Sequence, residues 1–493
     1  MRIETRPPGE ARRGGGDTEG LGGEGEPSGF YVRVSEPAGD LEPERFLGAA
    51  SESVRGFWQH DGRWLAWAGV AEQLRVPPAE AARRFELVRG ATRKLAAARW
   101  MSGGEGEPPP ARLYGGFGFD SGSRRGAEPF WEAFPPARFV LPALELGHGP
   151  GARLTATRRF DSSVGPEEAI RRLKARLSGI RAACRSTSPR GDQRPAAIAG
   201  SPTPGPDRAA AALPRAVAFH ESVSRATWAA GVEEILARIR GGQVRKVVLA
   251  RALDVSLAAP PDPLCVLGNL RAGNPRASVF LVEFGPAQAF LGAAPEVVGV
   301  LREGRFRATA VAGSIARGST REEDDRLASE LEHSAKNGLE HAIGVRDMVE
   351  RLSAAGAEPQ VDARPHVLRL AGIQHLRTDL VAEVGRRAHI LELVEALHPT
   401  AAVCGYPRSA AMEVLTSREA VNRGWYAGPV GWLETGGEGE FAPALRSAVI
   451  RGCRLRLFAG AGIVDGSRSD AEWQETAIKL HTILEALGIA ELP

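Results

Sequence analysis

Lysine is scarce in this chain of 493 residues. Only Lys94, Lys174, Lys246, Lys336 and Lys479 accompany 58 arginines. Arginine stays protonated in proteins, whereas a buried lysine can lose its proton. Where arginine is the default cation, a retained lysine is therefore a candidate for proton transfer, and the alternative is retention by chance.

The chain also lacks a charge excess, a long apolar run and a cysteine framework. Lys and Arg number 63 against 60 Asp and Glu, and this balance argues against a dedicated nucleic-acid binder. No apolar run reaches the ~18–20 residues of a membrane span, and no signal-peptide core is visible. The four cysteines include no CxxC pair, so neither a zinc site nor a disulfide framework is indicated. We expect a cytoplasmic enzyme without a nucleic-acid or membrane partner.

Composition divides the chain into four segments. Residues 1–28 are rich in Gly, Glu, Arg and Pro and are expected to form a disordered tail. Residues 29–185 combine strand-like runs with a helical stretch. Residues 186–216 lack periodicity and predict a flexible linker or insertion. Residues 217–490 interleave short apolar runs with long helical patterns, which excludes all-α and all-β folds.

The two long helical patterns carry acidic residues at informative positions. Each pattern, over about 319–352 and 469–487, opens with Ser-x-x-Glu, which fits a capping box. Glu340 lies mid-helix in the first, while Glu472 and Glu475 share one face of the second. Two helices that each direct a glutamate inward would form an oxygen-ligand site for Mg²⁺. The alternative, two solvated helix faces, is favoured by spacing alone.

Two further residues are candidates for acid–base chemistry. Lys246 lies in a strand-like run, where desolvation on an apolar face would make it a usable base. The alternative is a lysine that protects an edge strand. Glu296 follows Pro295 before another apolar run and is a candidate general acid if it is buried, or a solvated turn residue if it is not. The Gly-rich run 460–466 is interpreted as a turn whose amides could bind an anion.

These segments, in this order, resemble the chorismate-utilising enzymes, a family that includes isochorismate synthase, salicylate synthase and anthranilate synthase component I. The resemblance covers roughly residues 220–485 and extends loosely to 114–120. The matching segments are 246–251, 290–296, 312–318, 336–341, 374–378, 397–400, 404–408, 424–431, 444–447, 459–464 and 472–479. Their number and order make the resemblance specific.

The resemblance implies a fold, a cofactor and a set of ligand contacts. The implied fold is α+β, with two large, mainly antiparallel sheets packed face to face and helices outside. Mg²⁺ is implied, held by Glu340 and Glu475, with Glu472 as the candidate for a contact through water. The implied contacts with chorismate are Gly313, Ser314, His375, Thr400, Tyr426, Arg446, Gly460, Gly462 and Lys479.

Two positions indicate which reaction is expected. Members of this family that add ammonia have glutamine where this chain has Lys246, and aminodeoxychorismate synthases carry a nucleophilic lysine where it has Ala312. The resemblance therefore implies that Lys246 activates water for attack at C2 of chorismate. Glu296 would protonate the departing C4 hydroxyl, giving isochorismate. Some relatives have an acidic residue at the position of Asn337, which puts the metal affinity in doubt.

Several alternatives stay open at this stage. Salicylate synthase uses the same base and then eliminates pyruvate, and the sequence does not separate the two activities cleanly. The long N-terminal half resembles the isochorismate synthases of menaquinone biosynthesis and favours that activity over salicylate synthase, while an isochorismate synthase of a siderophore pathway stays an alternative. A non-catalytic chorismate-binding subunit is disfavoured because every expected catalytic residue is present. We expect an isomerase that is a monomer with no obligatory partner.

Overall fold

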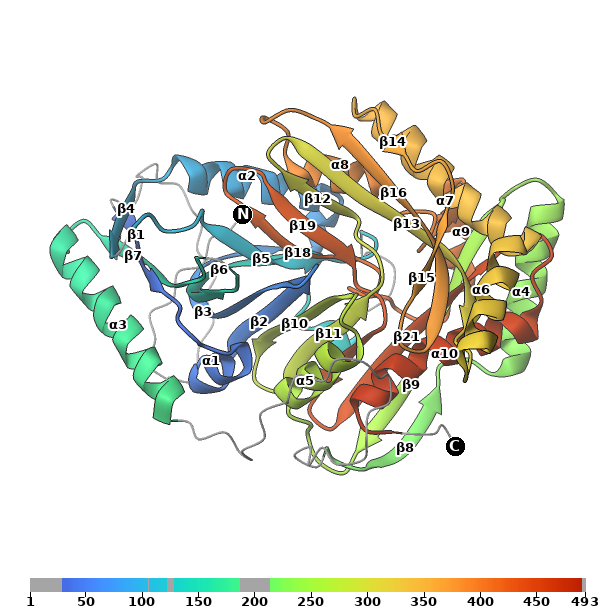
Figure 1. Ribbon diagram of the computed structural model, residues 1–493, viewed down its shortest axis with the longest axis horizontal. Helices are drawn as coiled ribbons and strands as arrows, with labels where there is room; N and C mark the ends of the chain where they lie inside the picture. Colours follow the sequence, from blue (N-terminus) through green and yellow to red (C-terminus); the bar gives the residue numbers. More distant parts are fainter. Residues whose placement is uncertain (1–28, 105, 122–127, 150, 187–212, 490–493) are drawn as a thin grey trace.

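The computed structural model describes residues 29–104, 106–121, 128–149, 151–186 and 213–489 (Figure 1). The expected disordered tail and all but the ends of the expected linker lie outside these described residues. The described strands are β1 (Gly29–Pro37), β2 (Val54–His60), β3 (Arg63–Val76), β4 (Trp100–Gly104), β5 (Arg112–Phe117), β6 (Ala137–Gly147), β7 (Arg153–Asp161), β8 (Ala216–Glu221), β9 (Lys246–Leu257), β10 (Ser278–Gly285), β11 (Gln288–Ala294), β12 (Gly299–Arg302), β13 (Arg305–Ala316), β14 (Gln360–Val361), β15 (His366–Arg369), β16 (Ile373–Glu383), β17 (Gly405–Tyr406), β18 (Pro429–Glu434), β19 (Gly439–Pro443), β20 (Ser447–Arg451) and β21 (Arg454–Ile463).

The described helices surround these strands. They are α1 (Pro43–Ala49), α2 (Arg84–Ala97), α3 (Pro166–Ser186), α4 (Arg225–Arg240), α5 (Pro263–Gly273), α6 (Arg321–His333), α7 (Ala335–Ala354), α8 (Ile390–Leu397), α9 (Arg408–Arg418) and α10 (Ser469–Ala486), with short 3₁₀ turns at Pro78–Arg83 and Pro129–Trp131. Figure 1 shows α3 at one end of the molecule and α4 and α6 at the other. Among the described residues, no helix has the length and apolarity that crossing a bilayer requires.

The strands join into one mainly antiparallel network that branches at β6. One edge of β6 pairs with β3 along its length, while the other pairs with β5 near its start and with β7 near its end. One arm continues through β3, β2, β10, β11, β20, β21 and β9, and the other through β5, β18, β19, β12, β13 and β16. The expected α+β class with a large antiparallel sheet is confirmed. The expected two sheets are joined into one network, because β6 is long enough for its two halves to bond to different neighbours.

The branching also joins the two halves of the sequence. β2 pairs with β10, and β5 pairs with β18, so each arm begins with strands of the expected segment 29–185 and continues with strands of the expected segment 217–490. The hydrophobic side chains form layers around this network. Phe290 and Leu291 on β11 illustrate the period of two, because Phe290 joins the cluster between the arms and Leu291 the cluster under α5 and α10.

The predicted helix over 319–352 is interrupted at Ser334. This residue has an extended backbone, and its hydroxyl caps α7 by accepting a hydrogen bond from the amide of Asn337. The predicted capping residue of α6 is displaced by one position, because Thr320 rather than Ser319 accepts from the amide of Glu323. The predicted capping box before α10 is wrong, since its N-cap is Arg468 and no side-chain hydrogen bond forms there.

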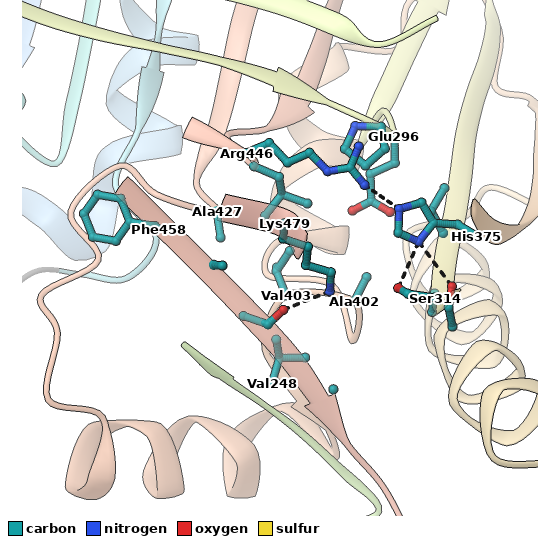
Figure 2. A pocket seen from close by; sticks show the side chains of 18 of the residues that line it. Val248, Glu296, Ser314, His375, Ala402, Val403, Ala427, Arg446, Phe458 and Lys479 are labelled. Atoms are coloured by element: carbon teal, nitrogen blue, oxygen red, sulfur yellow. Dashed lines mark hydrogen bonds between the residues drawn. The ribbon is translucent and has the colours of Figure 1, made fainter. Parts of the chain in front are cut away.

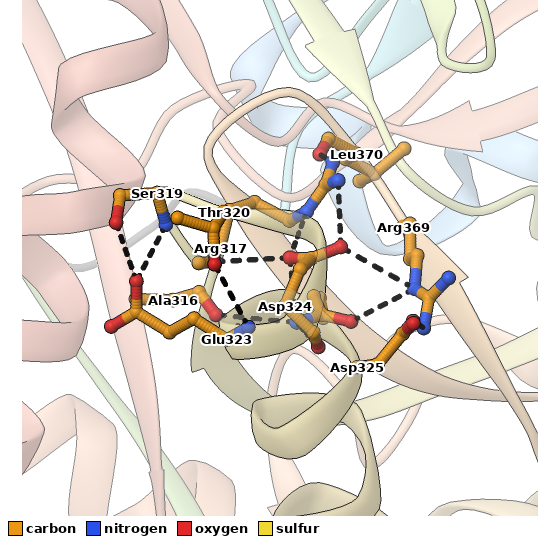
Figure 3. A network of polar contacts seen from close by, with 11 residues as sticks. Ala316, Arg317, Ser319, Thr320, Glu323, Asp324, Asp325, Arg369 and Leu370 are labelled. Atoms are coloured by element: carbon orange, nitrogen blue, oxygen red, sulfur yellow. Dashed lines mark hydrogen bonds and ion pairs between the residues drawn. The ribbon is translucent and has the colours of Figure 1, made fainter.

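A buried ion pair fastens α6 to the end of β13. Arg317 donates to both carboxylate oxygens of Asp324, from Nε at 2.6 Å and from Nη2 at 2.8 Å (Figure 3). The amide of Gly318 donates to the same carboxylate at 2.9 Å, and Gln374 of β16 donates to it at 3.2 Å. These bonds hold the pKa of Asp324 below its ordinary value, chiefly through Arg317. The clamp fixes the segment that leads from β13 to α7.

We predict that Asp324→Asn lowers the free energy of unfolding by about 2 kcal/mol, because a charged hydrogen-bond acceptor is lost. A carboxyl group with a depressed pKa stabilises the fold above the ordinary Asp value of about 4 and loses this effect as the pH falls. Acidification below that value should therefore destabilise the wild type more than the variant. Urea unfolding at neutral and acidic pH measures both effects. Asp325→Asn, at the neighbouring exposed carboxylate, is the matched control and should change little.

Candidate active site

A cavity with about 680 Å³ of space free of protein atoms lies where β9, β13, β16 and β21 meet α7 and α10. Ten of the predicted site residues line it: Glu296, Gly313, Ser314, Glu340, His375, Tyr426, Arg446, Gly460, Gly462 and Lys479. The rest of the cavity wall consists of apolar side chains, among them Val248, Val403 and Phe458 (Figure 2). This lining suits a small ligand with a few polar groups.

Glu296 is a buried acid rather than a solvated turn residue. It lies between β11 and β12, is 6% exposed and faces the cavity. Burial disfavours its charged form and raises its pKa to about 8, although the charge of Lys246 opposes this shift. At neutral pH the carboxyl group therefore holds a proton that it can donate.

His375 and Arg446 form one hydrogen-bonded unit at the cavity wall. Burial and the neighbouring Arg446 keep the pKa of His375 well below its usual range, so the imidazole is neutral. Arg446 donates to Nε2 of His375, which must therefore be the unprotonated nitrogen. Nδ1 then carries the proton and faces Oγ of Ser314 at 3.0 Å and the carbonyl of Gly313 at 3.2 Å (Figure 2).

Gly313 bends β13 toward this unit. The register between β13 and β16 shifts between Ala312 and Ser314, which marks a β-bulge, and Gly313 has a φ of +72°. A Cβ atom at Gly313 would lie 3.0 Å from Cβ of Asn337 on α7. Glycine therefore permits both the left-handed backbone and the close approach of the strand to the helix.

Lys246 lies immediately behind the cavity wall. It is fully buried on β9, and its Nζ lies 3.1 Å from Oε1 of Glu340. Gly462 on β21 packs against this pair, and a Cβ atom there would lie 2.1 Å from Oε1 of Glu340 and 2.9 Å from Cε of Lys246. Only glycine leaves room for the ion pair at this position.

Glu340 of α7 and Glu472 and Glu475 of α10 are each matched by a lysine. Lys336 contacts Glu472 at 2.9 Å and Glu340 at 3.8 Å, and Lys479 contacts Glu475 at 2.7 Å. Burial alone would raise the pKa of Glu340, but Lys246 and Lys336 hold it below the usual value. Among the described residues, no three His, Cys, Asp or Glu side chains form a cluster ready to hold a metal ion. The carboxylates of Glu340, Glu472 and Glu475 are instead paired with lysine ammonium groups.

The donor set nevertheless suits a hard divalent cation. Oε2 of Glu340 and Oε2 of Glu472 are buried and make no hydrogen bond with any residue that the structure describes. Unsatisfied buried carboxylate oxygens are costly, and Mg²⁺ takes one or two such oxygens together with water and ligand oxygens. Glu340 and Glu472 carry these free oxygens, whereas Glu475 is bonded to Lys479. The residues present fit Mg²⁺.

Two sequence-based interpretations are changed by the structure. The run from Gly460 to Gly462 belongs to β21 and not to a turn, and the carbonyl of Gly460 accepts a hydrogen bond from Lys479 at 2.9 Å. β20 pairs with β21 only as far as Phe458, so beyond that point β20 leaves this edge of β21 free. Thr400 is buried but is not part of the cavity wall.

The sequence reasoning missed one polar residue and most of the apolar wall. Lys336 was recognised within a matching segment but received no role, although its rarity as a lysine was a usable signal. Val248, Val403 and Phe458 carry no signal, because apolar residues in strands are expected in any core. Their place at the cavity follows from strand pairing that the sequence does not display.

One cavity thus holds a protonated carboxyl group, a neutral imidazole and several cations, which defines an enzyme site for a small anionic molecule. Residues 24–488 match the family described as chorismate binding enzyme, and the chain belongs to this family. It is 34% identical to the isochorismate synthase MenF of Bacillus subtilis over 76% of this chain and 74% of that protein.

A second relative and a solved structure cover nearly the whole chain. The salicylate biosynthesis isochorismate synthase of Pseudomonas aeruginosa is 35% identical over 94% of this chain and 92% of that protein. The structure of MenF, the menaquinone-specific isochorismate synthase of Escherichia coli, superposes with a TM-score of 0.70 at 26% identity, covering 94% of this chain and 95% of that one. The chain is therefore an isochorismate synthase homologue within the family of chorismate-utilising enzymes.

Gly462→Ala should disable the site more than it destabilises the fold. The added Cβ would displace Glu340 and Lys246, whereas a Cβ at Gly460 meets its nearest atoms only at 3.2 to 3.3 Å. We expect Gly462→Ala to lose at least about 100-fold in kcat/KM, because buried catalytic groups tolerate little displacement. Steady-state kinetics and thermal unfolding of both alanine variants measure this. A Gly460→Ala protein impaired as strongly as Gly462→Ala would contradict the steric argument.

Proposed function

We propose that this protein converts chorismate to isochorismate by adding water at C2 with loss of the C4 hydroxyl. The observation that carries the proposal is the burial of Glu296, which keeps a carboxyl group protonated at neutral pH within a cavity lined by cations. A protonated carboxyl group is the acid that departure of a hydroxide requires. The homology to isochorismate synthases agrees with this reaction.

Lys246 and Glu296 divide the proton transfers between them. Lys246, once neutral, takes a proton from the attacking water, and Glu296 gives its proton to the leaving C4 hydroxyl. Each residue ends the turnover in the opposite protonation state, so one net proton must pass back before the next turnover. Because Lys246 is paired with Glu340 in this structure, its neutral form requires that pairing to weaken when substrate is bound.

The remaining polar groups would hold the substrate. Arg446 and Lys479 supply positive charge for the carboxylates of chorismate, and the amides on the free edge of β21 add donors. The neutral His375 and Ser314 line the cavity beside Arg446 and would orient the ring. Tyr426 stacks on Phe458 with ring centroids 4.9 Å apart and closes the apolar side. Thr400 does not line the cavity, so it would affect the substrate only indirectly, through the residues that do.

Glu340 and Glu475, with Glu472 through water, would hold Mg²⁺. The ion supplies positive charge that neutralises a substrate carboxylate in a water-poor site. The orphaned oxygens of Glu340 and Glu472 support a metal site here, with Glu472 at least as well placed as Glu475. EDTA should abolish turnover under this proposal.

Menaquinone biosynthesis is the proposed destination of the product. The support is the full-length superposition on the menaquinone-specific enzyme of Escherichia coli. The relative from salicylate biosynthesis is 35% identical over the same share of this chain, against 26% for the Escherichia coli enzyme, so complementation is the decisive experiment. Growth of a strain that lacks its menaquinone-specific isochorismate synthase, under conditions that require menaquinone, tests the assignment.

Product analysis is the direct test of the reaction. Purified protein is incubated with chorismate and Mg²⁺ without ammonia, and products are resolved at short and long times. We expect isochorismate to approach a fixed ratio with chorismate, without release of pyruvate. Lys246→Gln should form no product while keeping its fold, because glutamine cannot accept the proton. Salicylate with equimolar pyruvate from the earliest times would identify a salicylate synthase instead.

Glu296→Gln should lower kcat by about 100- to 10,000-fold, the usual contribution of a general acid. Wild-type activity should fall as the pH rises above about 8, where Glu296 loses its proton. Because the folded pKa exceeds the unfolded value of about 4.3, the wild type also loses stability between these two pH values. The glutamine variant should not show that loss. Rate profiles and unfolding curves across this range decide both points, and unchanged turnover would exclude Glu296 as the acid.

A further inference from the structure

Lysines are concentrated at one place in this molecule. Three of the five in the chain, Lys246, Lys336 and Lys479, lie against the carboxylates of α7 and α10, although arginine is the common cation elsewhere. An arginine would bind a carboxylate through a planar fork with two parallel bonds, whereas lysine is a compact charge on a flexible stem. The chain therefore places single, mobile charges among the carboxylates.

Lys336 bridges carboxylates from two helices. Its Nζ lies 2.9 Å from Oε1 of Glu472 on α10 and 3.8 Å from Oε2 of Glu340 on α7. Both carboxylates are buried, and each keeps one oxygen without a hydrogen bond. A positive charge at this point neutralises a cluster that would otherwise consist of buried anions.

Helix stability does not explain a lysine at this position. Lys336 lies in the first turn of α7, where the helix dipole favours acidic residues, and no acidic residue is present in that turn. A lysine that precedes its glutamate by four residues is also the less favourable order for a helical pair. The pairing with Glu472 across two helices is therefore the contact that accounts for Lys336.

Among the three lysines, Lys336 is the one that can leave. Its side chain is 26% exposed, whereas that of Lys246 is 1% exposed. Lys479 is 21% exposed but is additionally held by the carbonyl of Gly460 at 2.9 Å. Lys336 has no such backbone contact among the described residues, and its stem can swing outward from the start of α7.

We propose that Lys336 is an internal counter-ion that occupies the carboxylate cluster in the metal-free protein, and that a divalent cation binds by displacing it. The inference rests on the proposed function for its metal site and adds a competitor built into the chain. Mg²⁺ needs the carboxylates that Lys336 contacts, and two cations cannot sit beside the same pair of carboxylates without strong repulsion. Lys336 thus lowers the affinity for metal and stabilises the metal-free fold.

Metal binding without substrate tests this inference. Wild type and Lys336→Gln are stripped with EDTA, exchanged into metal-free buffer and titrated with Mn²⁺, with free Mn²⁺ followed by electron paramagnetic resonance. We expect Lys336→Gln to bind Mn²⁺ about tenfold more tightly, the factor that corresponds to about 1.4 kcal/mol. In EDTA its unfolding temperature should be lower than that of wild type, and saturating Mn²⁺ should narrow the difference.

Lys94→Gln is the matched control, because Lys94 is exposed on α2 and its replacement removes the same charge. It should bind Mn²⁺ like wild type and unfold at the wild-type temperature. If Lys336→Gln does not fold in EDTA, Lys336→Arg is titrated instead. That variant should bind Mn²⁺ more weakly than wild type, because its forked cation holds carboxylates more firmly.

Mn²⁺ affinity in Lys336→Gln equal to or weaker than in wild type would overturn the inference, as would equal or tighter binding in Lys336→Arg. Absence of Mn²⁺ binding in every protein would overturn it too. Isochorismate formation by the same wild-type sample is measured separately. If the wild type forms product but Lys336→Gln binds Mn²⁺ no more tightly than wild type, only the counter-ion inference is overturned. Absence of product would refute the proposed function regardless of the Mn²⁺ result.

Discussion

The neutralisation of buried charge is the constraint on which this site depends. Glu340 lies within the protein, where an unpaired carboxylate is costly, and it is tolerated because Lys246 stands 3.1 Å away. That pair fits only because Gly462 leaves the space beside it empty of side chain. Strands β9 and β21 and helix α7 must therefore meet at one point, and the surrounding fold holds them there.

The branched sheet provides that meeting point. β9 and β21 pair along ten residues in one arm, and β13 and β16 pair in the other, so the site forms where the arms face each other. The bulge at Gly313 lets β13 approach α7, and the Arg317–Asp324 clamp fixes the connection between them. The break at Ser334 starts a new helix whose second turn carries Glu340 inward. Each of these features is local, but together they determine the position of the Glu340 carboxylate.

Burial raises the pKa of both Glu296 and Glu340, but neighbouring lysines reverse the outcome at Glu340 only. Glu296 has no close ion-pair partner, so desolvation dominates and keeps it protonated. Glu340 is equally buried, yet adjacent lysines keep it charged. The same type of side chain is thus protonated at one wall of the cavity and charged at another. The difference lies in whether an ammonium group is within ion-pair distance, which is a matter of geometry and not of residue type.

The order of residues along the chain was enough to establish the enzyme family, the α+β class, and the identity of ten residues in the cavity wall, because these depend on residue types in a fixed order. It also indicated α10 within a residue of its observed bounds, since a long periodic helix is a local property. It did not determine the branching at β6, the strand conformation of Gly460 to Gly462, or the interruption at Ser334. Strand pairing brings together residues that are hundreds of positions apart, and no local pattern records it. For the same reason, only the tertiary structure decided that three rare lysines converge on three glutamates, because their charges interact across elements that the sequence keeps separate.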